Sequence, residues 1–417
     1  LAFYNNRLRF SGTVYRSDNK NQILGISTAS STGATSRNIN AGLVRSQGIE
    51  MQLGGTIISN KDWHWDASVN YTKNNTYILS LVNGQTFFSF WQDGPTGSWT
   101  YVKGQPIPNQ FDAKGNQVIS DGKIGQLWDN AMATVTDKTS PYYGYPLLDD
   151  GGGLQKAGGG SFQSKITAGN FNPKLLMGFQ TSLTYKSVTL SLNIDTRFGG
   201  IFYSKTTRYM GSDATLASQL NVGIPIPASY ANNIPAYLKS NPDKFIKVVG
   251  FQQYHLVGGP NTALGGFPYN SNGNITINDG AFYPGVYSDG NGGYVENLGD
   301  PATTKYDNYE DAVTNGPWSF ARMDMFSASY IKLRNLNISV QMPQKWSSAL
   351  RLQGFSLGVY TQNIIIWTKA KAGIDPEQAF NYQPGAQSNG SQFKQGVEYY
   401  NITPWTIPLG VKLDVRF

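Results

Sequence analysis

The residue types that most often carry catalysis are scarce in this 417-residue chain. It has no cysteine and only two histidines, His64 and His255. A thiol nucleophile and a thiolate metal site are therefore excluded, and a Ser-His-Asp triad or a His-rich zinc site has little to draw on. Adjacent carboxylates such as Asp149 and Asp150 fall in expected loops, whereas glycosidase acids need a defined gap in space. We expect no enzymatic activity and no metal site.

One acidic loop has some character of a calcium site. Residues 289–292 read Asp-Gly-Asn-Gly, but they lack the spacing and the terminal Glu of an EF-hand loop. A plain turn is the favoured interpretation, and the expected cofactor is none. His64 alternates with aromatic neighbours in an expected strand, so we interpret it as a solvated polar side chain on the inner face.

Aromatic side chains are better candidates for binding, since they make up 13% of the chain. Flat aromatic faces suit sugars, peptide side chains or a protein partner. The favoured interpretation is that most of them pack the loops together, with partner contact and substrate contact as alternatives. The residues predicted to contact substrate or a lid protein are Trp91, Trp99, Tyr101, Trp128, Tyr143, Tyr254, Trp318, Tyr382 and Tyr399.

Strands with two contrasting faces would have to position those loops. From residue 406 to 417 every odd residue is apolar and every even residue is polar, charged or small, and residues 63–72 alternate in the same way. Side chains alternate across a strand. Strands that face lipid on one side and water on the other require this pattern over about ten residues.

The connections between these strands alternate between short and long. Strands are predicted at 7–24, 43–58, 63–80, 174–185, 188–198, 327–342, 353–367 and 406–417, with long extracellular loops at 25–42, 81–173, 199–326 and 368–404. We expect a β-bulge near Arg334 and Asn335, where the apolar parity slips, and short helices near 228–238 and 307–313. Long loops on one side and short turns on the other are typical of outer-membrane barrels.

Composition agrees with a membrane β protein. Charged residues are 14% of the chain, against about 25% in an average soluble domain. No apolar run approaches the roughly eighteen residues of a membrane-spanning helix. The net charge of +7 comes from scattered Lys and Arg, so we expect membrane lipid, and no nucleic acid, as a partner.

Four stretches resemble the SusC/RagA family of TonB-dependent outer-membrane transporters. Residues 40–50, N-A-G-L-V-R-S-Q-G-I-E, are similar to a family signature and depart from it at Ser46-Gln47. Further similar stretches are Y-I-K-L-R-N-L at 330–336 with Met342-Pro343, residues 362–368 with G-I-D-P-E at 373–377, and the strand at 404–417.

The resemblance implies an all-β fold, here about eight antiparallel strands of a 22-stranded transmembrane barrel. It also implies a Gram-negative outer-membrane location, import of glycan or peptide oligomers, a SusD-like lipoprotein lid, and energy from TonB acting on a plug. The plug and the N-terminal regions are expected to lie outside this sequence. The family's acidic N-G-D-G stretch is not evident, because residues 149–151 are a poor remnant of it, so bound calcium is unsupported.

Two other interpretations stay open from the residues alone. In an extracellular β-sandwich binding module the apolar faces would meet each other rather than lipid. A free-standing eight-stranded barrel is feasible by strand count, although its rim would be small for loops of this length.

Overall fold

The structure is a computed structural model. It describes residues 2–4, 7–27, 36–82, 84–112, 114–210, 224–230, 232–246, 257–258, 281–306, 318–370, 373–381, 394–400 and 405–417. Within these ranges, no helix has the length and the apolar character needed to cross a membrane.

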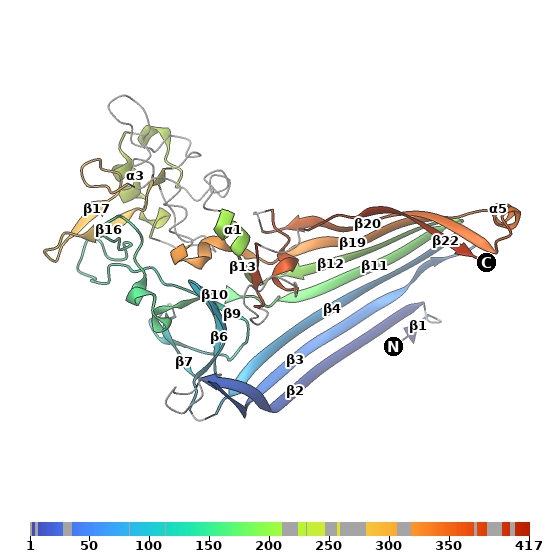
Figure 1. Cartoon of the computed structure of the whole chain (residues 1–417), viewed down its shortest axis with the longest axis horizontal. Helices are drawn as coiled ribbons and strands as arrows, with labels where there is room; N and C mark the ends of the chain where they lie inside the picture. Colours follow the sequence, from blue (N-terminus) through green and yellow to red (C-terminus); the bar gives the residue numbers. More distant parts are fainter. Residues whose placement is uncertain are drawn as a thin grey trace.

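A nine-stranded antiparallel sheet forms a long curved wall (Figure 1). In spatial order its strands are β1 (Ala2–Phe3), β2 (Leu8–Ser27), β3 (Ser36–Ser59), β4 (Trp63–Ser80), β11 (Leu175–Tyr185), β12 (Val188–Phe198), β19 (Tyr330–Gln341), β20 (Gly354–Thr368) and β22 (Leu409–Arg416). Each of the eight predicted strands corresponds to one of these. Over the described residues the sheet runs open from β1 to β22, and no second sheet of similar size faces it, so the sandwich and the closed eight-stranded barrel are both wrong.

The bounds of the loop predicted at 25–42 are wrong, and residues 28–35 lie outside the described residues. Strand β2 continues to Ser27 and β3 already begins at Ser36, with the two paired up to their ends. Polar Ser, Asn and Thr residues suggested a loop there. Main-chain ladder bonds between two long neighbours can continue through such residues, because pairing does not require apolar side chains.

The predicted bulge is confirmed. Asn193 of β12 pairs with Asn335 and Ile194 pairs with Leu333, so Arg334 has no partner in that ladder. On the other side of β19 the pairing passes over Arg334 and, in β20, over Asn363, one residue on each strand, so the register does not shift there. The register of that pair shifts between Ile331 and Lys332, where Ile366 is the extra residue of β20. Arg334 is therefore the extra residue only against β12, and the bulge turns its side chain away from the regular alternation.

Apolar side chains form continuous rows on the outer face of the sheet. The strand register aligns one such row through Phe10, Leu53, Val69, Phe179 and Ile194. Aromatic pairs bound this surface, with ring centroids 4.3 Å apart for Trp63 and Tyr185 and 6.5 Å apart for Phe198 and Trp367.

The height of this surface follows from strand geometry. The ten steps along β12, from Val188 to Phe198, correspond to roughly 33 Å at about 3.3 Å per residue and to about 25 Å of height at a tilt of about 40°. A lipid-facing band of an outer-membrane barrel has about this height.

Three of the predicted long loops, 81–173, 199–326 and 368–404, fold into a body at the end of the wall opposite helix α5 (Gln344–Ala349) (Figure 1). Its sheets are β5 (Phe87–Asp93), β6 (Thr96–Tyr101), β9 (Gln126–Asp129) and β10 (Ile166–Asn170); β7 (Pro106–Phe111) with β8 (Gln117–Ile119); β13 (Ile201–Ser204), β18 (Met325–Ser327) and β21 (Val397–Glu398); β14 (Val257–Gly258) with β15 (Ala281–Phe282); and β16 (Gly285–Ser288) with β17 (Tyr294–Asn297). The body also contains helices α1 (Lys205–Met210) and α3 (Ile234–Ser240) and 3₁₀ turns at Ala157–Gly160, Phe162–Ser164, Ala228–Tyr230, Pro242–Lys244, Ala321–Asp324 and Pro376–Ala379.

The long loop expected at 81–173 therefore contains short strands that the sequence pattern did not indicate. All six residues of β6 are buried, and a strand covered on both faces shows no alternation. The helix predicted near 228–238 is present as the turn at Ala228–Tyr230 followed by α3. The helix predicted at 307–313 lies outside the described residues.

Candidate functional site

A hollow of about 550 Å³ opens on the polar face of the wall. Its lining includes Arg9, Gln52, Asp66, Gln180 and Asn193, from five neighbouring strands. Small side chains between them leave the space: Gly54, Gly55, Ser68, Ser182 and Ser191. The surface offers donors, acceptors and one charge of each sign, as a water-filled route for polar solutes would require.

Hydrogen bonds fix the carboxylate in this hollow. Thr56 Oγ1 donates to Asp66 Oδ1 at 2.6 Å, and His64 Nε2 lies 2.7 Å from Asp66 Oδ2. The side chain of His64 is half exposed on the polar face. It therefore takes the solvated position expected from the sequence.

A buried lysine is the centre of the strongest charge cluster near the loop end of the wall. Lys332 Nζ on β19 lies 2.6 Å from Asp375 Oδ2 and 2.8 Å from Glu377 Oε2, and its side chain is 1% exposed. Both carboxylates belong to the segment after β20, where Asp375 caps the 3₁₀ turn by accepting from Glu377 N. We call Lys332, Arg334, Asp195, Asp375 and Glu377 the loop anchor.

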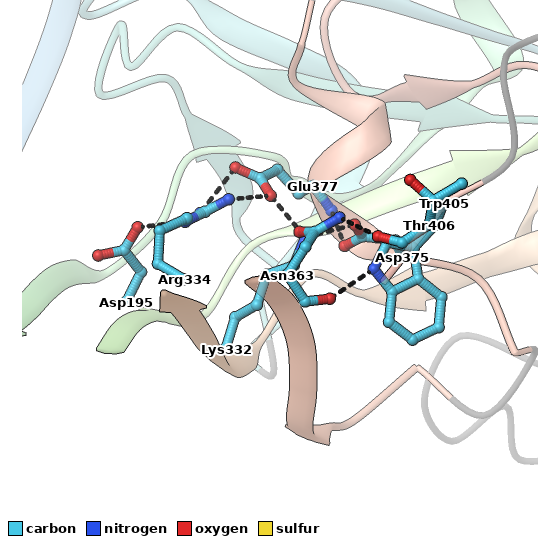
Figure 2. Close-up of polar contacts among 8 residues, drawn as sticks. All are labelled: Asp195, Lys332, Arg334, Asn363, Asp375, Glu377, Trp405 and Thr406. Atoms are coloured by element: carbon cyan, nitrogen blue, oxygen red, sulfur yellow. Dashed lines mark hydrogen bonds and ion pairs between the residues drawn. The ribbon is translucent and has the colours of Figure 1, made fainter. Parts of the chain in front are cut away.

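The bulged arginine completes the anchor (Figure 2). Arg334 donates through both terminal nitrogens to the two oxygens of Glu377, at 2.8 Å each, and through Nε to Asp195 Oδ2 at 2.7 Å. Burial alone would raise the pKa of Glu377, but the hydrogen bonds from Arg334 and Lys332 lower it to about 2. Glu377 is therefore charged at neutral pH, and paired bonds of this kind fix its orientation.

A second set of contacts, two hydrogen bonds, holds the chain before β22 to the wall. Asn363, which has a positive φ of 66°, donates from Nδ2 to the Thr406 carbonyl at 3.0 Å. Its own carbonyl accepts from Trp405 Nε1 at 2.8 Å (Figure 2). Arg334 of β19 and Asn363 of β20 thus both bind residues that follow β20.

Further ion pairs and hydrogen bonds connect the loops to each other. Glu398 of β21 accepts from Ser204 Oγ at 2.6 Å and from Thr206 Oγ1 at 2.5 Å. Asp93 of β5 lies within 2.8 Å of both Lys205 Nζ and Lys394 Nζ. Segments as far as 301 residues apart in sequence are therefore joined into one body at the end of the wall.

Known proteins resemble this chain in overall fold. No protein-family model matches the chain. TonB-dependent receptor P3 from Formosa agariphila is 19% identical over 426 residues, which cover 99% of this chain and 33% of the relative. The RagAB peptide transporter superposes over the full chain with a TM-score of 0.54 at 15% identity, and its closed-closed state gives 0.53 at 15% identity. The chain has the fold of a SusC/RagA-type partial barrel.

This partial barrel spans about one third of the length of the relatives it matches. The loop anchor joins two of the stretches that resemble the family, since Lys332 and Arg334 come from residues 330–336, and Asp375 and Glu377 from 373–377. Sequence reasoning noted both stretches but did not pair them. The available signal was two cations two residues apart in the first stretch and two carboxylates with the same spacing in the second.

The predicted contact aromatics divide into two groups in this SusC/RagA-type fold. Trp91, Trp99, Tyr101 and Trp128 are buried, and the rings of Trp99 and Trp128 stack at 4.8 Å. These four pack the loop core, as the favoured alternative held, and their rings offer no face to a ligand here.

The other predicted aromatics keep a contact role as a prediction. Tyr143 and Trp318 are 52% and 46% exposed, and Tyr399 is half-buried with Lys205 Nζ 5.0 Å from its ring centroid. Tyr254 and Tyr382 lie outside the described residues. Contact of these side chains with substrate or lid stays untested.

The acidic loops of the partial barrel form turns. Asp289 Oδ1 accepts from the backbone of Asn291 and Gly293 at 2.8 Å, and Asp149 Oδ1 accepts from Gly151 and Gly153. Across the described ranges no three His, Asp or Glu side chains gather closely enough to hold a metal ion.

Proposed function

We propose that this chain is part of the barrel wall of an outer-membrane TonB-dependent transporter that imports oligomeric nutrients, glycan or peptide, in a Gram-negative bacterium. The observation that carries the proposal is the two-faced sheet. Its outer face presents apolar rows over about the height of a lipid bilayer core, and its inner face holds the polar hollow lined by Arg9 and Asp66.

The relatives support the same proposal. One is named a TonB-dependent receptor and the others a peptide transporter or importer. None of these names describes an enzyme, which agrees with the scarcity of catalytic residue types in the chain. Energy from TonB would act on a plug supplied by the rest of the transporter.

In this function the loop body would form the outer rim of the cavity. The loop anchor and the Asp93 ion pairs hold that rim in place, and the exposed Tyr143 and Trp318 offer flat surfaces toward substrate or a SusD-like lipoprotein lid. Tyr and Trp bury large areas on binding while keeping a polar group available, which suits both roles.

The test is purification of the native protein from outer membranes in mild detergent, with intact masses of all chains that accompany it. We expect the rest of the barrel and the plug, as one polypeptide or two, together with a lipoprotein. Uptake of labelled peptides and labelled oligosaccharides by cells with and without the gene would then identify the substrate class. Recovery of the native protein as a monomer in water without detergent would overturn the proposal.

A further inference from the structure

The turns at the short end of the wall carry an excess of basic side chains. We call Arg7 and residues 60–62, 186–187 and 343–351 the short-turn rim. Backbone hydrogen bonds join its parts side by side, from Thr56 N to the Arg7 carbonyl, from Lys186 N to Asp62 O, and from Gln341 N to Ser187 O. The rim is therefore one continuous border of the sheet.

Five cations and one anion lie on this border. The basic residues, all exposed, are Arg7, Lys61, Lys186, Lys345 and Arg351. Asp62 is the single acidic residue of the defined rim, so its formal charge is five minus one, or +4. Over the whole sequence the basic excess is 33 against 26, so the rim is far more basic than the average.

Lys186 shows on which face of the sheet one of these charges lies. Its Nζ is 5.2 Å from the centroid of the Tyr185 ring, and Tyr185 in turn contacts Trp63 at 4.3 Å. Both aromatic side chains belong to the outer, apolar face and are about 40% exposed. The ammonium group therefore lies beside the outer aromatic border and not in the polar hollow.

Helix α5 repeats this combination at the far end of the rim (Figure 1). Trp346 and Leu350, four residues apart, are 57% and 61% exposed, and Lys345 and Arg351 flank them. Residues four apart share one side of a helical turn. An exposed Trp and Leu beside two cations suit the boundary between hydrocarbon and headgroups, where Trp and Tyr are enriched.

We propose that the short-turn rim binds the headgroups of anionic phospholipids. The inference rests on the proposed function, because that function puts the apolar rows in a bilayer and the short turns at its periplasmic face. Phosphate oxygens accept hydrogen bonds from Lys and Arg. Clustered basic residues next to an apolar anchor are attracted to anionic lipid, and salt weakens that attraction.

The test uses the complete transporter in nanodiscs that contain phosphatidylglycerol and phosphatidylcholine in equal amounts. The rim variant carries Lys61→Gln, Lys186→Gln, Lys345→Gln and Arg351→Gln together. A matched variant removes four exposed lysines of the loop body: Lys103→Gln, Lys114→Gln, Lys138→Gln and Lys244→Gln. The lipid that stays with the protein after transfer to detergent is counted by native mass spectrometry.

We expect the rim variant to keep several-fold less phosphatidylglycerol than the unsubstituted protein, the loop variant to match that protein, and phosphatidylcholine to be unchanged in both. Raising the salt should reduce retention in the unsubstituted protein and in the loop variant, but change it little in the rim variant. Equal phosphatidylglycerol retention in all three proteins, or an equal loss in both variants, would overturn the inference.

Failure of this inference can be told from failure of the proposed function. A transporter that purifies with its lipoprotein and takes up substrate, yet shows no rim-dependent lipid retention, contradicts the lipid site alone. A protein recovered from water without detergent contradicts both.

Discussion

The wall of this chain exposes many of its large apolar side chains, whereas the loop body buries them. In the wall, large apolar side chains such as Leu53, Val359 and Leu413 are exposed. In the loop body, side chains of the same kind, such as Phe202, Leu127 and Leu238, are almost fully buried. In the proposed function, one polypeptide therefore hides its apolar surface from water in two ways, by turning it toward lipid and by folding it inward.

This contrast shows that an exposed apolar side chain can be either unfavourable or favourable, depending on whether it meets water or lipid. An exposed apolar face of this size would be a liability in water, whereas in a bilayer it is the stable arrangement. The loop body must instead form its own core from short strands. It also buries charge, including Asp129 and Asp324, which a lipid-facing surface could not tolerate unpaired.

The loop anchor lies where the two regions meet, and its loss should have the largest effect. Lys332→Ala would leave Asp375 and Glu377 buried near each other with only Arg334 to compensate. Removing one partner of a buried ion pair costs about 3–5 kcal/mol. We expect this loss in the free energy of unfolding, measured by urea titration in detergent, with faster hydrogen exchange at residues 373–381.

Two controls separate charge from position in that experiment. Lys138→Ala removes an exposed lysine and should change stability little. The combination Lys332→Met with Asp375→Asn and Glu377→Gln removes the opposing charges together and should recover much of the loss. If the Lys332→Ala variant unfolded at the same urea concentration as the unsubstituted protein, the loop anchor would not stabilise the fold.

The next largest effect should come from placing a charge on the outer face. Leu192 lies near the middle of β12 in the apolar alternation. Leu192→Arg should cost about 2–4 kcal/mol, as expected for an arginine near the bilayer midplane. The measurement is the folded fraction in lipid vesicles, read from the gel shift of the unheated protein across a urea series.

Asn193→Arg is the matched control one residue away. Asn193 lines the polar hollow, so its arginine would meet water and should change stability far less. Equal losses from the two substitutions would mean that both faces meet the same medium, which contradicts the opposition between wall and loop body.

Lowering the pH should destabilise the loop anchor and stabilise the loop core. Glu377 has its pKa lowered from 4.5 to about 2, so its stabilisation is complete above about pH 4.5 and is lost as the pH falls toward 2. Burial raises the pKa of Asp129 to about 6 and that of Asp324 to about 7. These two groups favour the folded state when protonated, so they stabilise the loop core as the pH falls from 7 to 5.

Each carboxylate contributes at most about 1.4 kcal/mol per pH unit. Hydrogen exchange, corrected for the intrinsic rate, should show slower opening of residues 126–130 between pH 7 and 5, and faster opening of residues 373–381 below pH 4.5. Asp129→Asn should reduce the first change, and Glu377→Gln should abolish the second. The same sign of response in both segments would contradict the assignment.

Sequence patterns predicted the wall far better than the loop body, for a physical reason. A strand between lipid and water must alternate at every position, so the ends of strands such as β4 and β11 are visible in the sequence within a residue or two. Strand β6 is buried on both sides and mixes Thr, Gly, Ser and Trp. Nothing in its sequence carries a period, and its partner β9 lies more than twenty residues away.

The site was predictable in part. The bulge at Arg334 followed from a parity slip, but its ionic partners Glu377 and Asp195 lie 43 and 139 residues away in other elements. The aromatic types indicated binding surfaces, yet Trp99 and Trp128 fill the loop core. Residue type alone does not show which side of a loop faces inward, because that depends on contacts between distant segments.

The smallest effect should come from the left-handed residue of β20. Asn363 has a positive φ of 66° and also donates to the Thr406 carbonyl. Asn363→Gly loses the side-chain hydrogen bond, worth about 0.5–1.5 kcal/mol, but glycine adopts this backbone conformation freely. Asn363→Ala loses the bond and adds strain of about 1 kcal/mol in the left-handed region.

We therefore expect the alanine variant to be less stable than the glycine variant by about 1 kcal/mol, measured by urea titration in detergent. Hydrogen exchange at residues 405–406 should rise in both variants, because both lose the bond to Thr406. Equal stability of the two variants would show that the backbone relaxes at this position. The residues after β20 would then be held by the loop anchor and the Trp405 bond, without help from a strained turn.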